Sequence, residues 1–296
     1  MPPRLGAFLA VVLWGISFVA TKAALREISP VTLIFTRSAL GTALLLVTLA
    51  VRRLPLVPPR ATWGPLALMG FVGVCFHQLL QAFGIRLTTA VHAGWIVGLI
   101  PIWSAVLAGL FLRERFGPGK LAGLAFGFAG AVLVVSRGRI GPGLLALPGT
   151  RGDLLMLAST LNWAVYTALG HATIRRLGSL RATAGAMFLG GLMLAPLFLY
   201  SGGWREYAAL SGPGAAAVLY LGIGASGLGY LFWYGALERV ETTRVAAFLY
   251  LEPLVTLIAA MVLLRESVGP ATLAGGLMVL AGVALVQRAP ARTATD

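Results

Sequence analysis

The sequence predicts an all-α integral membrane protein with ten transmembrane helices, arranged as two inverted five-helix repeats around a central cavity. Composition is the first observation, because hydrophobic residues make up 58% of the 296 positions and charged residues only 11%. The mean hydropathy of +0.90 is more than a soluble domain can hide in its interior. The second observation is that apolar stretches fill almost the whole chain, and the third is an internal repeat.

Ten apolar stretches are long enough to cross a bilayer, which takes roughly 20 residues for about 30 Å of hydrocarbon. In chain order they cover residues 5–25, 30–51, 64–85, 91–112, 119–136, 152–173, 182–200, 213–237, 245–264 and 270–287. Glycine and proline mark the breaks, as at Gly117 and Pro118 or at Gly269 and Pro270. Arg4 before the first stretch also fits a signal peptide, but a counterpart in the second repeat favours a retained helix.

The basic residues predict the orientation of these helices. A net charge of +14 would suggest nucleic acid as the partner of a soluble protein, but here arginine and lysine gather at helix ends. Anionic lipid explains that placement better, so we expect membrane lipid as a partner and no nucleic acid. If the N-terminus is cytoplasmic, the larger share of the basic residues lies in cytoplasmic connections, for example Arg52, Arg53, Arg113 and Arg115. Both termini are therefore predicted to be cytoplasmic.

An internal repeat divides the chain into residues 1–150 and 151–296. The segment LRERFGPGKLAG at residues 112–123 returns as LRESVGPATLAG at residues 264–275, with eight of twelve positions identical. The same spacing pairs Pro101 with Pro253. Each half would hold five helices, and because five is odd the second half must enter the membrane in the opposite sense. Inverted repeats of this kind are a recurring device of secondary transporters.

The ten stretches, the paired prolines and the paired LRE…GP…LAG segments resemble the drug/metabolite transporter superfamily, in particular its EamA-type members. Within that group the chain is most similar to the YddG-type exporters of amino acids, aromatic ones included. The resemblance covers essentially the whole chain. It implies a basket of helices around a central cavity in the bacterial inner membrane, with helices 5 and 10 at the periphery and export from the cytoplasm.

Polar side chains within the third stretch are candidate substrate ligands. His77, Gln78 and Gln81 have spacings that place them on one helical face, and they offer donors and acceptors suited to a zwitterion. Polar groups in hydrocarbon are costly and normally face a cavity or another helix. Contact between helices, with no role in transport, is the competing interpretation.

Charged residues give a second set of candidates. Glu252 lies within the ninth stretch, directly before Pro253, where it could bind an ammonium group or carry a proton. A structural carboxyl in a kinked helix is the alternative. Lys22 and Arg37 lie near span ends and are candidates for a charge or coupling role, although Arg37 could equally extend to the membrane surface. Pro101 and Pro253 are candidate hinges.

Aromatic residues complete the predicted cavity. The sixth stretch carries Asn162, Trp163 and Tyr166 on one face, and the other candidates are Trp95, Tyr230 and Tyr250. Asp153 stands at a helix start, where it suits the helix dipole. His92 is expected at the interface.

An exporter explains these features better than the other classes do. No pair of carboxylates within one span, no metal-ligand spacing and no phosphate-binding loop favours an enzyme. A channel would need a filter or a ring of charge. We therefore expect alternating-access export of amino acids or similar metabolites by a monomer without a cofactor, with efflux of drugs or organic cations as the alternative.

Overall fold

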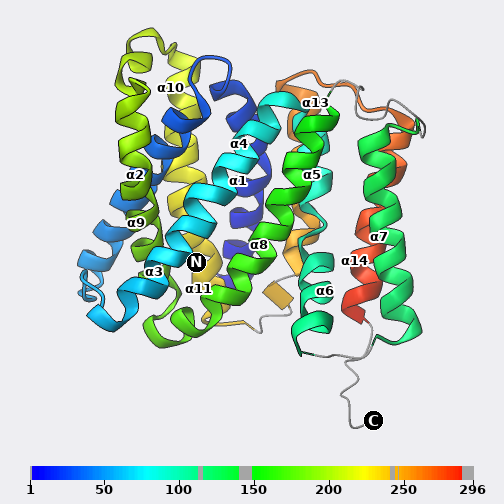
Figure 1. The fold of residues 1–296 in the computed structure, drawn as a ribbon, viewed down its shortest axis with the longest axis horizontal. Helices are drawn as coiled ribbons and strands as arrows, with labels where there is room; N and C mark the ends of the chain where they lie inside the picture. Colours follow the sequence, from blue (N-terminus) through cyan, green and yellow to red (C-terminus); the bar gives the residue numbers. More distant parts are fainter. Residues whose placement is uncertain (1, 113–115, 140–148, 241–243, 246, 289–296) are drawn as a thin grey trace.

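Helices form every regular element that the computed structural model describes, namely in residues 2–112, 116–139, 149–240, 244–245 and 247–288 (Figure 1). Arg113, Glu114 and Arg115 of the repeated segment lie outside these residues, as does the C-terminus. The elements of the first half are α1 (Pro3–Ala24), α2 (Pro30–Val51), η1 (Arg60–Thr62), α3 (Trp63–Met69), η2 (Gly70–Phe76), α4 (His77–Leu87), α5 (Ala90–Val97), α6 (Ile100–Leu112) and α7 (Pro118–Ser136). Those of the second half are α8 (Thr150–Leu177), α9 (Ser179–Tyr200), η4 (Gly203–Ala209), α10 (Gly212–Leu219), η5 (Tyr220–Leu228), α11 (Gly229–Leu237), η6 (Ala247–Leu251), α13 (Glu252–Leu263) and α14 (Pro270–Arg288).

Within the described residues, eight helical stretches are long and apolar enough to cross a membrane. Two of the ten predicted spans fall outside this set for different reasons. The 28-residue α8 is long, but its polar and charged residues lower its mean hydropathy. The apolar helix at Ala247–Leu263 is shorter than a full span. The all-helical membrane class is therefore confirmed, and the number of ten spans stays a prediction.

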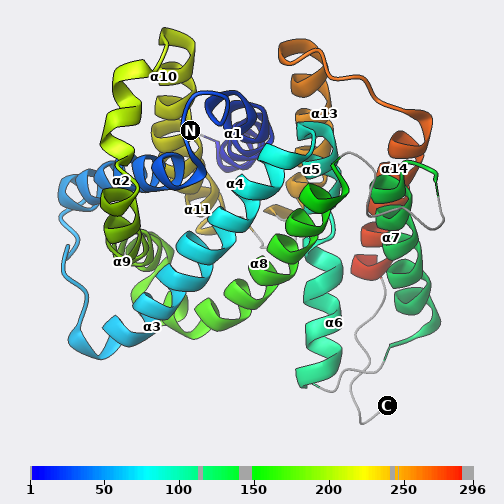
Figure 2. The ribbon, with the colours of Figure 1, turned by 45° about the horizontal axis from the view of Figure 1, so that its top comes forward.

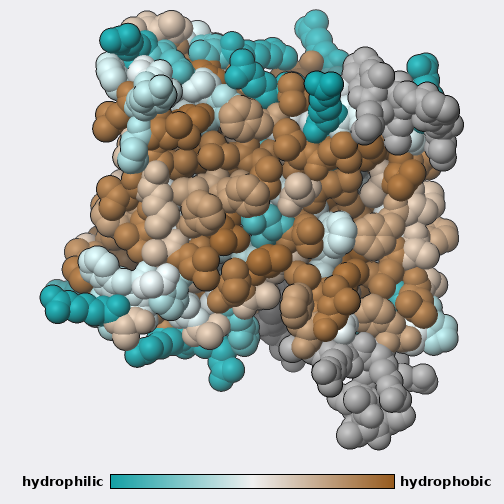
Figure 3. Space-filling view, viewed as in Figure 1, coloured by the Kyte–Doolittle hydropathy of each residue, from teal (hydrophilic) through white to brown (hydrophobic). Residues whose placement is uncertain are grey.

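A broad apolar band crosses the face of the bundle seen in Figure 3. Figure 3 shows hydrophobic residues across the middle of one face, with hydrophilic residues gathered toward its upper and lower edges. Large side chains such as Phe111, 79% exposed, and Val262, 69% exposed, point outward. Because helices satisfy their own backbone hydrogen bonds, such a surface suits lipid hydrocarbon.

Helices α7 and α14 pack on each other at one edge of the bundle (Figures 1 and 2). Glycines permit the close approach of their backbones: a Cβ on Gly130 would lie 2.5 Å from the carbonyl oxygen of Gly275. A Cβ on Gly275 would lie 2.7 Å from the carbonyl oxygen of Gly130. Small residues at a membrane helix interface serve this purpose, so glycine is a packing residue here.

Polar contacts between the two halves tie together the end of the bundle that is uppermost in Figure 1, which we call the capped end. The backbone N–H of Ser29 donates to the Glu206 carboxylate at 2.6 Å, and the side-chain hydroxyl of the same residue caps α2. The hydroxyl and the backbone N–H of Ser211 both donate to Glu27 at 2.7 Å. These two bonds hold the pKa of the Glu27 carboxyl below its ordinary value.

A third tie at the capped end joins the start of α5 to the loop before α14. The Glu266 carboxylate accepts the backbone N–H groups of Ala90 at 2.9 Å and of Val91 at 3.0 Å. First-turn N–H groups have no partner within their own helix, and a carboxylate also suits the helix dipole. Glu266 therefore fixes the beginning of α5 against the second half of the chain.

Candidate functional site

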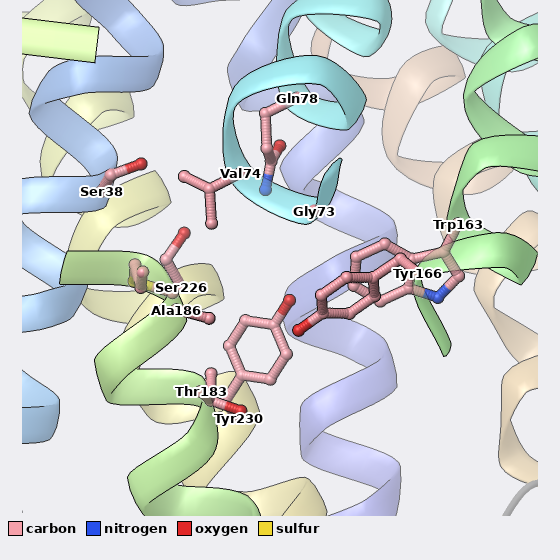
Figure 4. Close-up of a pocket in the computed structure, with 11 residues that line it drawn as sticks. Ser38, Gly73, Val74, Gln78, Trp163, Tyr166, Thr183, Ala186, Ser226 and Tyr230 are labelled. Atoms are coloured by element: carbon pink, nitrogen blue, oxygen red, sulfur yellow. The ribbon is translucent and has the colours of Figure 1, made fainter. Parts of the chain in front are cut away.

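A pocket in the middle of the bundle is the candidate binding site (Figure 4). The pocket is narrow in this structure, because its empty volume of about 350 Å³ includes the open space at its mouth. Helices from both halves of the chain supply the lining residues, which are Ser38, Gly73, Val74, Gln78, Trp163, Tyr166, Thr183, Ala186, Met187, Ser226 and Tyr230.

Two π-helical segments form part of the wall. They are η2, which supplies Gly73 and Val74, and η5, which supplies Ser226. A π-helix shifts the backbone hydrogen bonds of a helix by one residue, and such segments are frequent at functional sites. Each segment has a carbonyl that accepts a side-chain N–H from another helix, because Asn162 Nδ2 donates to Val72 at 2.8 Å and Trp14 Nε1 donates to Ala225 at 3.0 Å.

Aromatic rings line the other side of the pocket. Trp163 and Tyr166 project from α8 with ring centroids 4.8 Å apart, and Tyr230 projects from α11. The hydroxyl groups of Tyr166 and Tyr230 point toward one another in Figure 4. Gly73 makes room for this arrangement, since a Cβ there would lie 2.5 Å from Tyr166 Cε2.

Arg37 stands behind the polar wall of the pocket. Its Nε donates to Ser226 Oγ at 3.0 Å and its Nη1 donates to Gln78 Oε1 at 3.3 Å, and both partners line the pocket. The side chain is only 8% exposed. Extension of Arg37 to the membrane surface, one of the two expectations from sequence, is therefore wrong, because its partners draw it inward.

Four other cavity candidates from the sequence are absent from the pocket lining, namely His77, Gln81, Trp95 and Tyr250. His77 is buried, with Nδ1 3.0 Å from the Ser159 carbonyl oxygen and its ring 4.7 Å from that of Trp163, so it supports the aromatic wall from behind. Trp95 is buried against Gly276, and its indole nitrogen has no partner within the described residues. Gln81 and Tyr250 are half-buried outside the lining.

Glu252 and the two prolines lie where helices resume after an interruption. Pro253 is the second residue of α13, which follows the 3₁₀ segment η6, and Pro101 is the second residue of α6, which follows the break between α5 and α6. Proline suits the first turn of a helix because no N–H is required there. The half-buried Glu252 has no hydrogen bond from its carboxylate to a described residue, but it interacts electrostatically with Tyr230.

His92 and Asp153 form a buried pair between the pocket and the capped end. His92 Nδ1 lies 3.0 Å from Asp153 Oδ2, and the other carboxylate oxygen accepts the Thr88 hydroxyl. His92 Nε2 lies 3.3 Å from Thr272 Oγ1. His92 lies in the first turn of α5, at a span end as expected, and the carboxylate at the start of α8 holds its ring inside the bundle.

Lys22 binds backbone carbonyls close to the His92–Asp153 pair. Its Nζ donates to the carbonyl oxygens of Ile85, at 2.8 Å, Arg86, at 3.2 Å, and Thr88. These carbonyls lie at the end of α4, where the helix dipole favours a cation. All three hydrogens of the ammonium group are used in this way, so Lys22 joins α1 to the turn between α4 and α5.

Sequence reasoning missed several lining residues, among them Ser38, Gly73, Thr183, Ala186 and Met187. Small and apolar residues give no distinctive signal in a membrane helix, since the same types pack helices together throughout the chain. A usable signal existed only for Ser226, which precedes Tyr230 by one helical turn. Within the described residues no group of three histidine, cysteine or acidic side chains could hold a metal ion.

Comparison with known proteins places the chain among transporters. The EamA-like transporter family matches it twice, over residues 2–136 and 150–288. An uncharacterized transporter of Archaeoglobus fulgidus is 34% identical over 94% of each chain. A protein of Streptantibioticus cattleyicolor named a probable terminal-alkyne amino-acid exporter is 30% identical over 95% of this chain and 91% of its own. A solved crystal structure shares the fold, with a TM-score of 0.67 at 21% identity over 96% of this chain and 95% of that one.

Proposed function

Because the chain belongs to the EamA-like transporter family, we propose that it exports amino acids, or small metabolites with similar groups, from the cytoplasm by alternating access. The observation that carries the proposal is the pocket between the two halves, where aromatic rings face a wall of hydrogen-bonding side chains. Such a site suits a small molecule with an apolar body and a polar head. The similarity to the Streptantibioticus exporter supports the same substrate class.

Alternating access requires two halves that can exchange conformations, and the chain has the features for it. We take residues 1–150 and 151–296 as inverted repeats of five transmembrane helices each. Corresponding places in the two halves carry a π-helical segment, at Gly70–Phe76 and Tyr220–Leu228. Each half also has a helix that resumes at a proline after a break. Discontinuous helices at the midplane are a recurring feature of transporters built from inverted repeats.

The orientation completes the proposal. With both termini in the cytoplasm of a bacterial cell, the capped end faces away from the cytoplasm. Its ties through Glu27, Glu206 and Glu266 hold the two halves together there. Substrate then enters the pocket from the cytoplasmic end, and these ties must open before it can leave.

The test is transport by the purified protein in liposomes, with a panel of labelled amino acids and with or without a pH gradient. We expect saturable, competable uptake, and a dependence on the gradient would show proton coupling. Trp163→Ala and Glu252→Gln should each lower the initial rate several-fold while the protein stays folded. Tyr200→Ala, at a ring that is 92% exposed, is the matched aromatic control. Saturable uptake that neither variant changes would show that Trp163 and Glu252 take no part in transport.

Efflux of organic cations is the second candidate, and Glu252 favours it, because its carboxylate has no hydrogen bond to a described residue and interacts electrostatically with Tyr230 of the pocket. A lipophilic cation could use this carboxylate as its counter-charge and the rings as its surface. Uptake of a labelled quaternary ammonium compound, with no uptake of any amino acid, would decide in favour of this candidate.

A further inference from the structure

Arg37 is a buried guanidinium whose hydrogen-bond partners are both neutral. Burial of a charge is unfavourable unless other groups compensate it. Two of the five N–H groups of Arg37 donate to Ser226 and Gln78, and the remaining three have no partner within the described part of the chain. The unpaired N–H groups of such an arginine can still bind an anion.

The same arginine sets the direction of the two side chains in front of it. Arg37 donates to Gln78 Oε1, so the amide NH₂ of Gln78 is directed away from it and into the pocket, as Figure 4 shows. Ser226 Oγ accepts from Arg37 Nε, which leaves the hydroxyl hydrogen of Ser226 free to donate. Both groups therefore face the pocket as donors backed by a positive charge.

Two further donors converge on this space. The hydroxyls of Tyr166 and Tyr230 point toward one another in Figure 4, and neither has a hydrogen-bond partner among the described residues. Four side-chain donors thus line one small pocket, and a positive charge stands behind two of them. A carboxylate, which only accepts hydrogen bonds and takes several at once, is the group that this arrangement matches.

We propose that Gln78 and Ser226, backed by Arg37, bind the carboxylate of the transported substrate, while Trp163 packs against its apolar body. The inference rests on the proposed exporter function and narrows its substrate class to small carboxylates, with or without an amino group. It also disfavours a cation at this wall, since a cation there would face a positive charge and donor hydrogens, whereas the Glu252 carboxylate is outside the pocket lining. Arg37 acts as a specificity-determining residue.

The test compares two probes that share an apolar body and differ in the charged end, 3-phenylpropanoate and 3-phenylpropylamine. Their binding to the purified full-length protein in detergent is measured by calorimetry. We expect the carboxylate to bind at least tenfold more tightly than the amine. Arg37→Gln should weaken carboxylate binding at least tenfold, and it should strengthen binding of the amine because the repulsive positive charge is gone. Arg37→Lys should show an intermediate loss, because an ammonium group cannot make both bonds with the same geometry.

Arg86→Gln is the matched control, because it removes one positive charge at an exposed side chain and should leave both affinities unchanged. Equal binding of the two probes to the wild-type protein would overturn the inference without any variant. Retained carboxylate affinity in a folded Arg37→Gln protein would overturn it as well. Arg37-dependent carboxylate binding without amino-acid transport would instead contradict the exporter function and leave the carboxylate site intact. Transport of amino acids that the Arg37 variants do not change would support the exporter function and contradict the carboxylate site.

Discussion

Two buried polar clusters in the same bundle differ in how many of their hydrogen bonds are satisfied. In the first cluster the Asp153 carboxylate receives Thr88 and His92, and the far nitrogen of His92 meets Thr272. In the second cluster Arg37 donates to Gln78 and Ser226, and all three residues retain donors that no described residue accepts. We call these the closed cluster and the open cluster.

The difference shows what separates a structural polar group from a binding group in a membrane helix. Both clusters contain a buried ionisable residue, so burial and charge alone do not identify the site. The hydrogen bonds of the closed cluster join α5, α8 and α14 to one another, so substitutions in it should lower the free energy of unfolding. The open cluster has unused donors at an accessible pocket, so substitutions in it should lower the affinity for a ligand.

The largest expected effect comes from Asp153→Ala in the closed cluster. It leaves two buried groups, on Thr88 and His92, without their acceptor, at about 1–3 kcal/mol of unfolding free energy for each. Unfolding by titration with SDS in mixed micelles measures this loss. Asp153→Asn, which keeps one acceptor oxygen, should lose less. The protein that remains folded should bind 3-phenylpropanoate as the wild type does, and an altered preference between the two probes would contradict the division into two clusters.

The second-largest effect is expected when Arg37 of the open cluster is given an acidic partner within the protein. Gln78→Glu places a carboxylate of nearly the same shape beside Arg37. This carboxylate should form a charge-assisted hydrogen bond with the guanidinium and neutralise the charge that would otherwise attract a ligand. We expect at least a tenfold loss of 3-phenylpropanoate affinity, with thermal stability unchanged or higher. Gln81→Glu on the same helix is the control, because Gln81 does not line the pocket. Unchanged affinity in the Gln78 variant would show that the ligand does not use this wall.

The same contrast explains how much of the molecule the sequence predicts. Apolar length, helix breaks and the repeated LRE…GP…LAG segments predict the helical membrane class, because hydrocarbon leaves few alternatives to a helix. Trp163, Tyr166, Gln78 and Tyr230 were accessible to sequence reasoning because large or polar residues at helical spacing mark one face. The inward direction of Arg37 and the pairing of His92 with Asp153 could not be predicted from the sequence, because they depend on partners up to 189 positions away.

The smallest expected effect concerns the weakest contact of the closed cluster, between His92 Nε2 and Thr272 Oγ1. At 3.3 Å it is longer than most hydrogen bonds of this kind. Thr272→Val keeps the shape of the side chain, and we expect a loss of about 0.5 kcal/mol, at the low end of the usual contribution. Thr42→Val is the matched control, because the buried hydroxyl of Thr42 has no hydrogen-bond partner among the described residues. Its removal should leave stability unchanged or raise it, since an unpaired buried hydroxyl is itself a cost. Equal changes in the two variants would mean that Thr272 contributes only its shape, and that the closed cluster ends at His92.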